Sequence, residues 1–344
     1  MKIANFKAAL FIGITIFLVS TSVYFYQMFF SRNLVNNGYT EAFIHIPPGA
    51  TIFHVKDTLE KYRLVDDVLS FMFVSRVLDY QENVKPGRYR LTAGMNNLEA
   101  VRLLRSGIQV PVKVIFHNVR LKEELPEKLC KNLWTDPDDF YALLTNPQKV
   151  AEVGFDTLTI ACMFIPNTYY LYWNTSAEEL FARMKREYDR FWNEKRRSQA
   201  DGLGLTPIQV SILASIVQAE TNQNDEKPRI AGVYLNRLHK KMPLQADPTL
   251  VFAQGDFSIK RVLNSMKKID SPYNTYKHTG LPPGPINIPE ISSIDAVLNA
   301  ERHRYLFFCA KEDLSGYHNF AETLEEHNRN AQKYISALNR KGIK

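Results

Sequence analysis

The 344-residue sequence has few cysteines, and their positions exclude most cysteine chemistry. Cys130, Cys162 and Cys309 lie far apart, and no C-x-x-C pair or Cys/His cluster accompanies them. Structural zinc sites need such clustered ligands. Each cysteine has apolar neighbours, so we expect three buried thiols. There is also no lysine-centred cofactor pattern, and the sequence therefore predicts neither a metal nor a cofactor.

A nucleic-acid-binding motif is also missing, although the formal net charge is +7. The basic residues are scattered, so we expect no nucleic-acid partner. A positive charge of this size suits attraction to another anionic polymer or to anionic lipid. The contents of apolar residues (45%) and charged residues (23%) are those of a globular protein and exclude a disordered chain.

Charged residues are absent between Ala8 and Phe30, and this absence predicts a membrane span. A span needs about 20 apolar residues. The run exceeds the h-region of a cleaved signal peptide, the alternative interpretation, and no small-x-small cleavage site follows it. Lys2 and Lys7 precede the run, which predicts a cytoplasmic N-terminus over residues 1–7, a transmembrane helix over 8–30, and an extracytoplasmic remainder.

Beyond the span we predict an α+β protein of two domains. Residues 31–40 form a predicted linker, with a natural cleavage point at Asn36 to Gly38. Residues 41–120 alternate as strand (42–46), helix (51–62), helix (68–78) and strand (88–91), followed by a helix over 96–105. This βααβ order resembles a LysM module, a glycan-binding fold. A packing module that only positions the second domain is the alternative. Residues 121–344 form that second domain, of mixed α/β type.

The stretch from Pro207 to Thr221 predicts a helix that ends in a carboxylate. Thr206 and Gln209 fit a capping box, and apolar residues follow at helical spacing. Glu220 continues the apolar stripe, whereas Gln218 and Asn222 are expected to point elsewhere. Burial and the negative end of the helix dipole should raise the pKa of Glu220, as a general acid requires. Fraying from the last turn, or pairing inside a core, is the alternative.

Polar loops follow this helix and suggest a carbohydrate cleft. They are Met242 to Thr249, Tyr273 to Tyr276 and Gly280 to Pro285, with prolines that stiffen them. Their glutamine, aspartate, asparagine, threonine and tyrosine side chains can hydrogen-bond to sugars and stack on them. A helix-borne acid beside such loops points to glycan chemistry.

Five motifs lie in this order: E-T-x-x-x-x-E, A-x-V-x-x-N-R-L, M-x-L-Q-x-D-P-T, Y-N-T-Y and G-L-P-P-G-P. Together they resemble the endolytic murein transglycosylase family, also called MltG or YceG-like. The resemblance implies cleavage of the β-1,4 bond between N-acetylmuramic acid and N-acetylglucosamine in nascent peptidoglycan, with a 1,6-anhydro product and termination of strand growth. A lysozyme-type muramidase and a non-catalytic murein-binding scaffold are the alternatives.

The resemblance assigns Glu220 as the catalytic acid and base. Ordinary glycosidases use two carboxyl groups, but in a lytic transglycosylase the substrate supplies the nucleophile. The resemblance also carries over substrate-binding or cleft-shaping residues: Glu226, Asn236, Gln245, Asp247, Thr249, Tyr273 and Asn274.

Several of these residues have structural alternatives. Glu226 could instead cap the next helix, and Asp247 could make the turn before Pro248. Arg237 is interpreted as a structural residue that forms an ion pair, and His318 as a structural histidine. Asn167 stands where the family has aspartate in an F-x-P-D-T-Y block, so it receives no role in proton transfer.

The implied setting is the inner membrane, with peptidoglycan glycan strands as substrate. The membrane itself is the second predicted partner, through the single-pass anchor. An association with peptidoglycan synthases is implied by the family alone, because no residue in this sequence indicates an interface.

Overall fold

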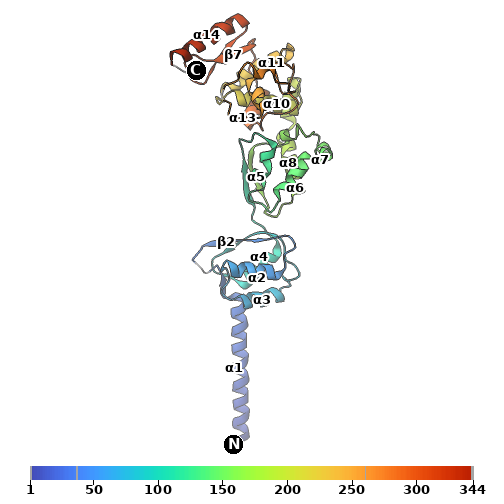
Figure 1. The fold of residues 1–344 in the computed structure, drawn as a ribbon. Coiled ribbons are helices and arrows are strands. Elements are labelled where there is room, and N and C mark those ends of the chain that lie inside the picture. Colours follow the sequence, from blue (N-terminus) through green and yellow to red (C-terminus); the bar gives the residue numbers. More distant parts are fainter. Residues whose placement is uncertain (1, 36–37, 260, 342–344) are drawn as a thin grey trace. The chain divides into compact units, whose positions relative to one another are not determined.

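The computed structural model describes residues 2–35, 38–259 and 261–341. The chain forms two compact units (Figure 1). Unit 1 is Met1–Val114 with Asn132–Thr135 and Tyr170–Thr175, and unit 2 is Ile115–Lys131, Asp136–Tyr169 and Ser176–Lys344. Helices dominate and the strands are short and paired two by two, which confirms the α+β prediction. The predicted boundary after residue 120 falls within unit 2.

Helix α1 (Lys2–Phe30) opens unit 1 and is the only candidate membrane span that is one continuous helix in the described residues. Its segment Phe6–Phe30 has a mean hydropathy of 2.0 and none of it is buried within the protein. A 25-residue helix is longer than the roughly 20 residues that cross a bilayer. Its length and composition therefore fit the predicted anchor.

The rest of unit 1 has the predicted βααβ order. Strand β2 (Glu41–Ile46) pairs antiparallel with β3 (Gly87–Thr92), and between them lie α2 (Ile52–Lys61) and α3 (Val68–Val77). Helix α4 (Asn97–Ser106) follows. The strand β2 buries Ile44 and Ile46 and exposes the alternating residues Phe43 and His45, so one face of the sheet covers the core.

The predicted linker over residues 31–40 is wrong for its first half. Strand β1 (Arg32–Leu34) pairs with β4 (Met95–Asn96), and Leu34 and Val35 are 0% and 1% exposed. The Nδ2 atom of Asn33 lies 2.7 Å from Oδ1 of buried Asn97. Polar asparagines suggested a linker, but Asn33 is buried and paired. Asn36 and Asn37, at the predicted cleavage point, lie outside the described residues.

Unit 2 is mostly helical. The sequence predicts one strongly charged helix over residues 178–195, but this stretch is broken into two helices because the side chain of Asn193 caps the second one. Residues 247–249, predicted as the end of a loop, instead begin a helix that runs to Gln254, since Pro248 fits the first turn. Along the chain after α4, the elements are β5 (Val112–Phe116, paired with β6), α5 (Leu125–Cys130), α6 (Pro137–Thr145), α7 (Pro147–Glu152), β6 (Asn167–Leu171), α8 (Ala177–Phe191), α9 (Glu194–Gly202), α10 (Pro207–Glu220), α11 (Lys227–His239), α12 (Asp247–Gln254), α13 (Ile291–Leu298), β7 (Phe307–Ala310, paired with β8), β8 (His318–Ala321) and α14 (Leu324–Arg340).

Helix α10 is the centre of unit 2. Its capping box is present as predicted, with bonds in both directions between Thr206 and Gln209. The predicted single apolar stripe is wrong, however, because every residue from 210 to 217 is buried. Helices α9, α11, α12 and α13 all contact α10. Ser215 also binds a distant loop, since its hydroxyl accepts a hydrogen bond from the backbone N–H of Ile286 at 3.0 Å.

The burial of β1 generates a prediction about truncation. A fragment that begins at Thr40 should unfold at a lower temperature than one that begins at Ser31, because it loses Leu34 and Val35 from the core. Full burial of one such side chain is worth about 1.5–3 kcal/mol. Calorimetry of the two fragments measures the difference. Equal transition temperatures for unit 1 would contradict the assignment of residues 32–35 to the folded unit.

Candidate active site

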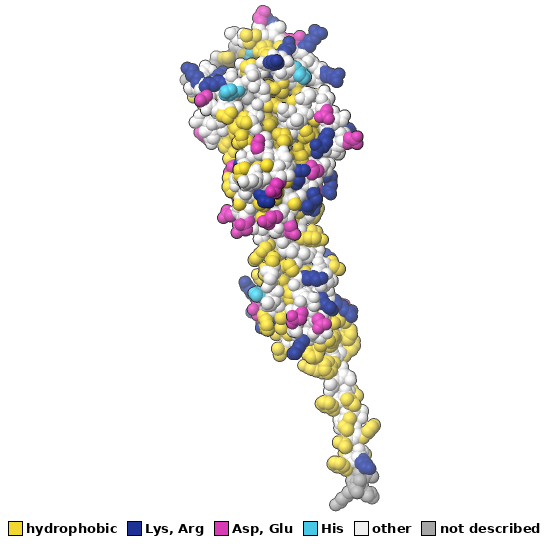
Figure 2. All heavy atoms as spheres, turned by 90° about the vertical axis from the view of Figure 1, so that its right-hand side faces the viewer, with side chains coloured by type: hydrophobic (Ala, Val, Ile, Leu, Met, Phe, Trp, Pro, Cys, Tyr) yellow, Lys and Arg dark blue, Asp and Glu magenta, His cyan; other side chains and the backbone are white. Residues whose placement is uncertain are grey.

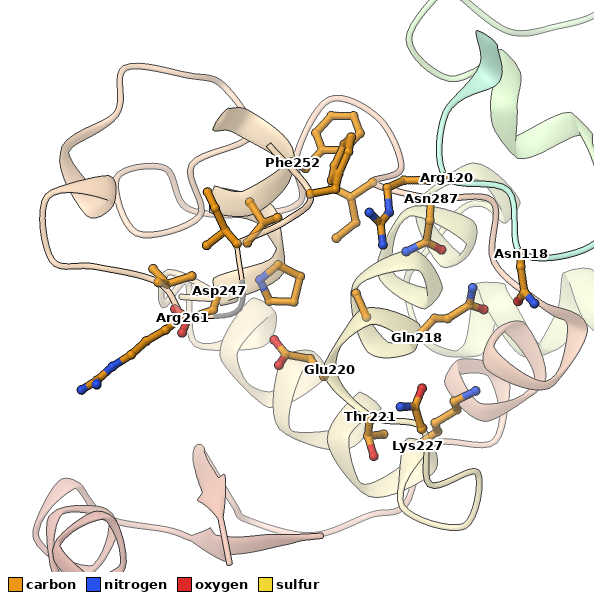
Figure 3. A pocket seen from close by; sticks show the side chains of 18 of the residues that line it. Asn118, Arg120, Gln218, Glu220, Thr221, Lys227, Asp247, Phe252, Arg261 and Asn287 are labelled. Atoms are coloured by element: carbon orange, nitrogen blue, oxygen red, sulfur yellow. The ribbon is translucent and has the colours of Figure 1, made fainter. Parts of the chain in front are cut away.

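A cavity of about 1310 Å³ surrounds the C-terminal end of α10. Glu220, the last residue of α10, and Asp247, the first residue of α12, both face it (Figure 3). Both polar and apolar side chains line it, which suits a ligand that has both hydroxyl groups and hydrophobic faces. The lining also includes Asn118, Arg120, Gln218, Thr221, Asn222, Lys227, Phe252, Phe257, Arg261, Asn287, Glu290 and Tyr334.

Glu220 lies at the edge between core and cavity. The hydroxyl of Tyr234, a buried residue of α11, donates to its Oε1 at 2.5 Å. Burial raises the pKa of Glu220 from its ordinary 4.5 to about 7, and the negative charge of Asp247 adds to the rise. The hydrogen bond from Tyr234 and the charge of Arg237 lower this pKa but do not outweigh burial. The predicted rise is confirmed, so Glu220 can both give and take a proton near neutral pH.

Asp247 has a tyrosine partner of its own. The hydroxyl of Tyr276 donates to Oδ1 of Asp247 at 2.5 Å. The segment around Asp247 is held in place by buried Thr275, whose hydroxyl accepts a bond from the N–H of Ala246 at 3.0 Å and lies 2.8 Å from the hydroxyl of Thr249. These contacts join the Met242 to Thr249 segment to the Tyr273 to Tyr276 segment, as the grouping of polar loops had suggested.

Gln218 and Asn222 also line the cavity, so the prediction that they point elsewhere is wrong. The helix ends at Thr221, which is extended (φ −146°, ψ 144°), and the wall of the cavity curves around this end. The Oε1 atom of Gln218 accepts a bond from the N–H of Glu290 at 2.6 Å. Oε1 of Glu290 in turn accepts a bond from the N–H of Asn118 at 3.0 Å. Three separate segments therefore meet at this wall.

Glu226, the second acid of the E-T-x-x-x-x-E motif, is not in the lining of this cavity. It is 4% exposed, and its carboxylate accepts a bond from the N–H of His318 at 2.8 Å and contacts Nδ1 of the same residue at 2.7 Å. It sits at the start of α11 but makes no side-chain cap. Glu226 therefore connects the strand β8 to the start of α11. This pair agrees with the structural interpretation of His318.

Several other predicted residues lie outside the lining of the cavity. Asn236 donates to the carbonyls of His303 and Tyr305, and Asn274 donates to those of Lys267 and Ile269. The remaining three also lie outside the lining: Thr249 is fully buried, Tyr273 packs on Phe252 with ring centroids 4.7 Å apart, and Gln245 is exposed. Of the carried-over set, Glu220 and Asp247 line the cavity.

Arg237 has a structural environment, as predicted, but its partners differ from the ion pair expected. It is 7% exposed, and its guanidinium donates to the carbonyls of Leu306 at 2.6 Å and of Leu244 at 2.7 Å. Among the described residues no carboxylate forms a salt bridge with it. A buried cation surrounded by carbonyl oxygens fixes the backbone behind the cavity.

Two features of the site were not predicted from the sequence. They are the tyrosine partners of the two carboxylates and the contact between Arg120 and the ring of Phe257. Tyr234 lies 14 residues after Glu220, and no local pattern brings the two together. Arg120 follows β5 and places its guanidinium over the ring of Phe257, 4.4 Å from the centroid.

Within the described part of the chain, no group of three or more potential ligands could hold a metal ion. Cys130 and Cys162 are buried thiols, and Cys309 is partly exposed.

These features define a proton-transfer site in a large polar cavity, and comparisons with known proteins identify the family. The profile of the YceG-like family matches residues 44–333, so the chain belongs to this family. A Bacillus subtilis (strain 168) protein named endolytic murein transglycosylase is 30% identical over 320 residues, which cover 87% of this chain and 86% of the relative.

Two further comparisons agree. A Streptococcus pneumoniae (strain D39) protein with the same name is 26% identical over 86% of this chain, which spans 58% of that longer relative. The crystal structure of a YceG-like protein from Listeria monocytogenes superimposes with a TM-score of 0.53 at 27% identity, covering 84% of this chain and 98% of the other.

The electrostatics of the site predict opposite pKa shifts in two variants. Asp247→Asn should lower the pKa of Glu220 below about 7, because it removes a nearby negative charge. Tyr234→Phe should raise it further, because the ionised carboxylate loses its hydrogen-bond donor. Titration of a ¹³C-labelled glutamate carboxyl by NMR measures both, and Glu220→Gln identifies the signal. Shifts in the same direction would show that the assigned causes are wrong.

Proposed function

We propose that this chain is an endolytic murein transglycosylase, a lyase that cuts peptidoglycan glycan strands internally. It would break the β-1,4 bond between N-acetylmuramic acid and N-acetylglucosamine and leave a 1,6-anhydro end on the muramic acid. Membership of the family and the names of the relatives support the reaction. The observation that carries the proposal is Glu220, a carboxyl of pKa about 7 that faces a large polar cavity.

Glu220 serves first as an acid and then as a base. In its protonated form it gives its proton to the glycosidic oxygen as the bond from C1 of the muramic acid breaks. The 2-acetamido oxygen of the substrate assists this departure. The Glu220 carboxylate then takes the proton of the C6 hydroxyl, whose oxygen bonds to C1 and closes the anhydro ring. A pKa near the working pH suits both steps, and Glu220 ends protonated again.

Two neighbours of Glu220 have roles in this scheme. Tyr234 is a positioning residue, because its bond to Oε1 fixes the carboxyl and leaves Oε2 available to the substrate. Asp247 keeps a negative charge on the cavity wall, where it can stabilise the positive charge that develops at C1. Glu226, Asn236, Gln245, Thr249, Tyr273 and Asn274 lie outside the lining of the cavity, so we assign them a supporting role rather than contact with the sugar.

The membrane setting is part of the same proposal. Helix α1 would be a single-pass anchor in the inner membrane, with a cytoplasmic N-terminus and unit 2 outside the cytoplasm. The order of β2, α2, α3 and β3 supports a LysM-like interpretation of unit 1, for which contact with glycan is the expected role. An association with peptidoglycan synthases is a further expectation from the family.

Product analysis tests the reaction. The full chain in detergent is incubated with uncross-linked glycan strands, and the products are identified by mass spectrometry. Anhydro ends on internally cut strands support the proposal. Reducing ends would identify a muramidase, in which Asp247 as second carboxylate directs water. Intact strands that still bind to the protein would identify a scaffold, and either of these results would overturn the proposal.

Glu220→Gln is the sharpest variant for the mechanism. The amide keeps the shape of the side chain and can still accept the bond from Tyr234, but it cannot transfer a proton. We expect activity to fall by about 100-fold or more, since positioned proton transfer is worth about 10²–10⁴-fold. Binding of glycan should survive. Release of anhydro products at a rate near that of the unaltered protein would remove Glu220 from the mechanism.

The same variant should change how stability depends on pH. Glu220 binds its proton more tightly in the folded chain, where its pKa is about 7, than in the unfolded chain, where it is about 4.5. Its contribution to stability is therefore complete below pH 4.5 and is lost as the pH rises through 7. Thermal unfolding should show Glu220→Gln gaining stability over the unaltered protein at pH 8 but not at pH 4. A variant that is destabilised at both pH values would indicate a structural role.

A further inference from the structure

Helix α3 carries apolar residues on two opposite faces. Its inner face buries Phe71 and Val74 completely in the core of unit 1. On its outer face Leu69 is 76% exposed and Val77 is 52% exposed. A helix that is apolar on all sides is normally surrounded by protein or lipid. Among the described residues, none covers Leu69 or Val77.

The outer face of α3 is attached to the end of α1. The ring of Phe73 lies 5.8 Å from that of Phe25 and 6.4 Å from that of Phe29, both in the last turns of α1. Asn97 of α4 donates to the carbonyl of Met28 at 2.8 Å. These contacts hold α3 beside the point where α1 enters unit 1 (Figure 1), and Figure 2 shows hydrophobic side chains gathered at this junction.

The length of α1 gives the depth of this junction. A hydrocarbon core of about 30 Å takes about 20 residues at about 1.5 Å per residue. Counted from Lys7, the last charged residue before the apolar run, the core ends near Gln27. Phe25 and Phe29 lie on either side of this position, so α3 contacts α1 at the level where hydrocarbon gives way to headgroups.

We propose that α3 lies in the headgroup region of the leaflet from which α1 emerges, with Leu69 and Val77 facing the acyl chains. The proposal rests on the membrane anchorage proposed for α1. The apolar surface of α3 continues the lipid-facing surface of α1, where Tyr26 and Phe30 are 64% and 51% exposed. Aromatic residues of this kind mark the membrane interface. Unit 1 therefore contacts the bilayer through both α1 and α3, rather than through α1 alone.

The only charged side chain of α3 fits the same location. Arg76 is exposed in its last turn, next to Val77. A long arginine side chain can lie along an apolar surface and extend its guanidinium to lipid phosphate. Helices that lie in the membrane plane combine apolar anchors with basic residues in this way. With two points of contact, the anchor would fix the tilt of unit 1 over the membrane as well as its distance.

Spin-label accessibility tests the proposal in the full chain. Cys309 is the one partly exposed native cysteine, so Cys309→Ala gives the background for labelling. Leu69→Cys and Val77→Cys place labels on the outer face of α3, and both side chains are exposed enough to replace without disturbing the core. Ile108→Cys is the matched control, since Ile108 is an apolar residue of unit 1 that is 70% exposed. Ile14→Cys reports on α1 itself.

The labelled proteins are reconstituted into bilayers of phosphatidylethanolamine and phosphatidylglycerol. Collisions with oxygen, which concentrates in lipid, are compared with collisions with a water-soluble nickel complex. We expect the ratio of oxygen to nickel collisions at Leu69 and Val77 to exceed that at Ile108 several-fold. Equal ratios at the three positions, with Ile14 in lipid, would overturn the proposal and leave the anchor intact. A nickel-accessible Ile14 would overturn the anchor as well. Labels at Leu69 and Val77 that neither reagent reaches would show a protein partner on α3 and also overturn the proposal.

Discussion

Packing on every side of α10 is the constraint on which the site depends. Because residues 210 to 217 are all buried, the helix cannot rotate or shift to give its last side chain to water. Glu220 must leave the core where α10 ends, and the surrounding elements leave it only the cavity. Ser215 extends this constraint outward, since it holds the loop that begins at Ile286 against the helix. The same packing that makes unit 2 stable therefore places one carboxyl at the wall of the cavity.

Competing effects act on that carboxyl, and burial outweighs the others. The bond from Tyr234 and the charge of Arg237 favour the ionised form of Glu220, but the loss of water and the charge of Asp247 disfavour it more strongly. Arg237 has a small effect on the pKa of Glu220 because its N–H groups donate to backbone carbonyls rather than to the carboxylate. Had it formed an ion pair with Glu220, the pKa would fall and the acid would be lost. The carbonyl partners of Arg237 thus matter to the chemistry although they lie behind the cavity.

Local patterns were predicted well from the sequence, and long-range contacts were not. The capping box of α10 and the individual helices and strands of the βααβ order follow from residues within a few positions of one another. The pair of Glu226 and His318 joins residues 92 positions apart, and Tyr234 reaches Glu220 from a different helix. The linker prediction at Asn33 was wrong for a related reason. Asparagine is typical of linkers, but here a distant partner, Asn97, pairs with it inside the core. Because residues so far apart in the sequence leave no periodic pattern, these pairs are found only in the folded structure.

The two glutamates of one motif show how position decides between chemistry and architecture. Glu226 stands at the start of α11, where the helix dipole favours a negative charge, and it receives both the N–H and the ring nitrogen of His318. Glu220 stands at the end of α10, where the dipole opposes a negative charge, and its hydrogen-bond donor in the structure is the single hydroxyl of Tyr234. Glu226 is thus held by two contacts with one residue and lies outside the lining of the cavity. Glu220 has a pKa raised to about 7 by burial and faces the cavity, so it is the residue of the pair that can exchange a proton with a substrate.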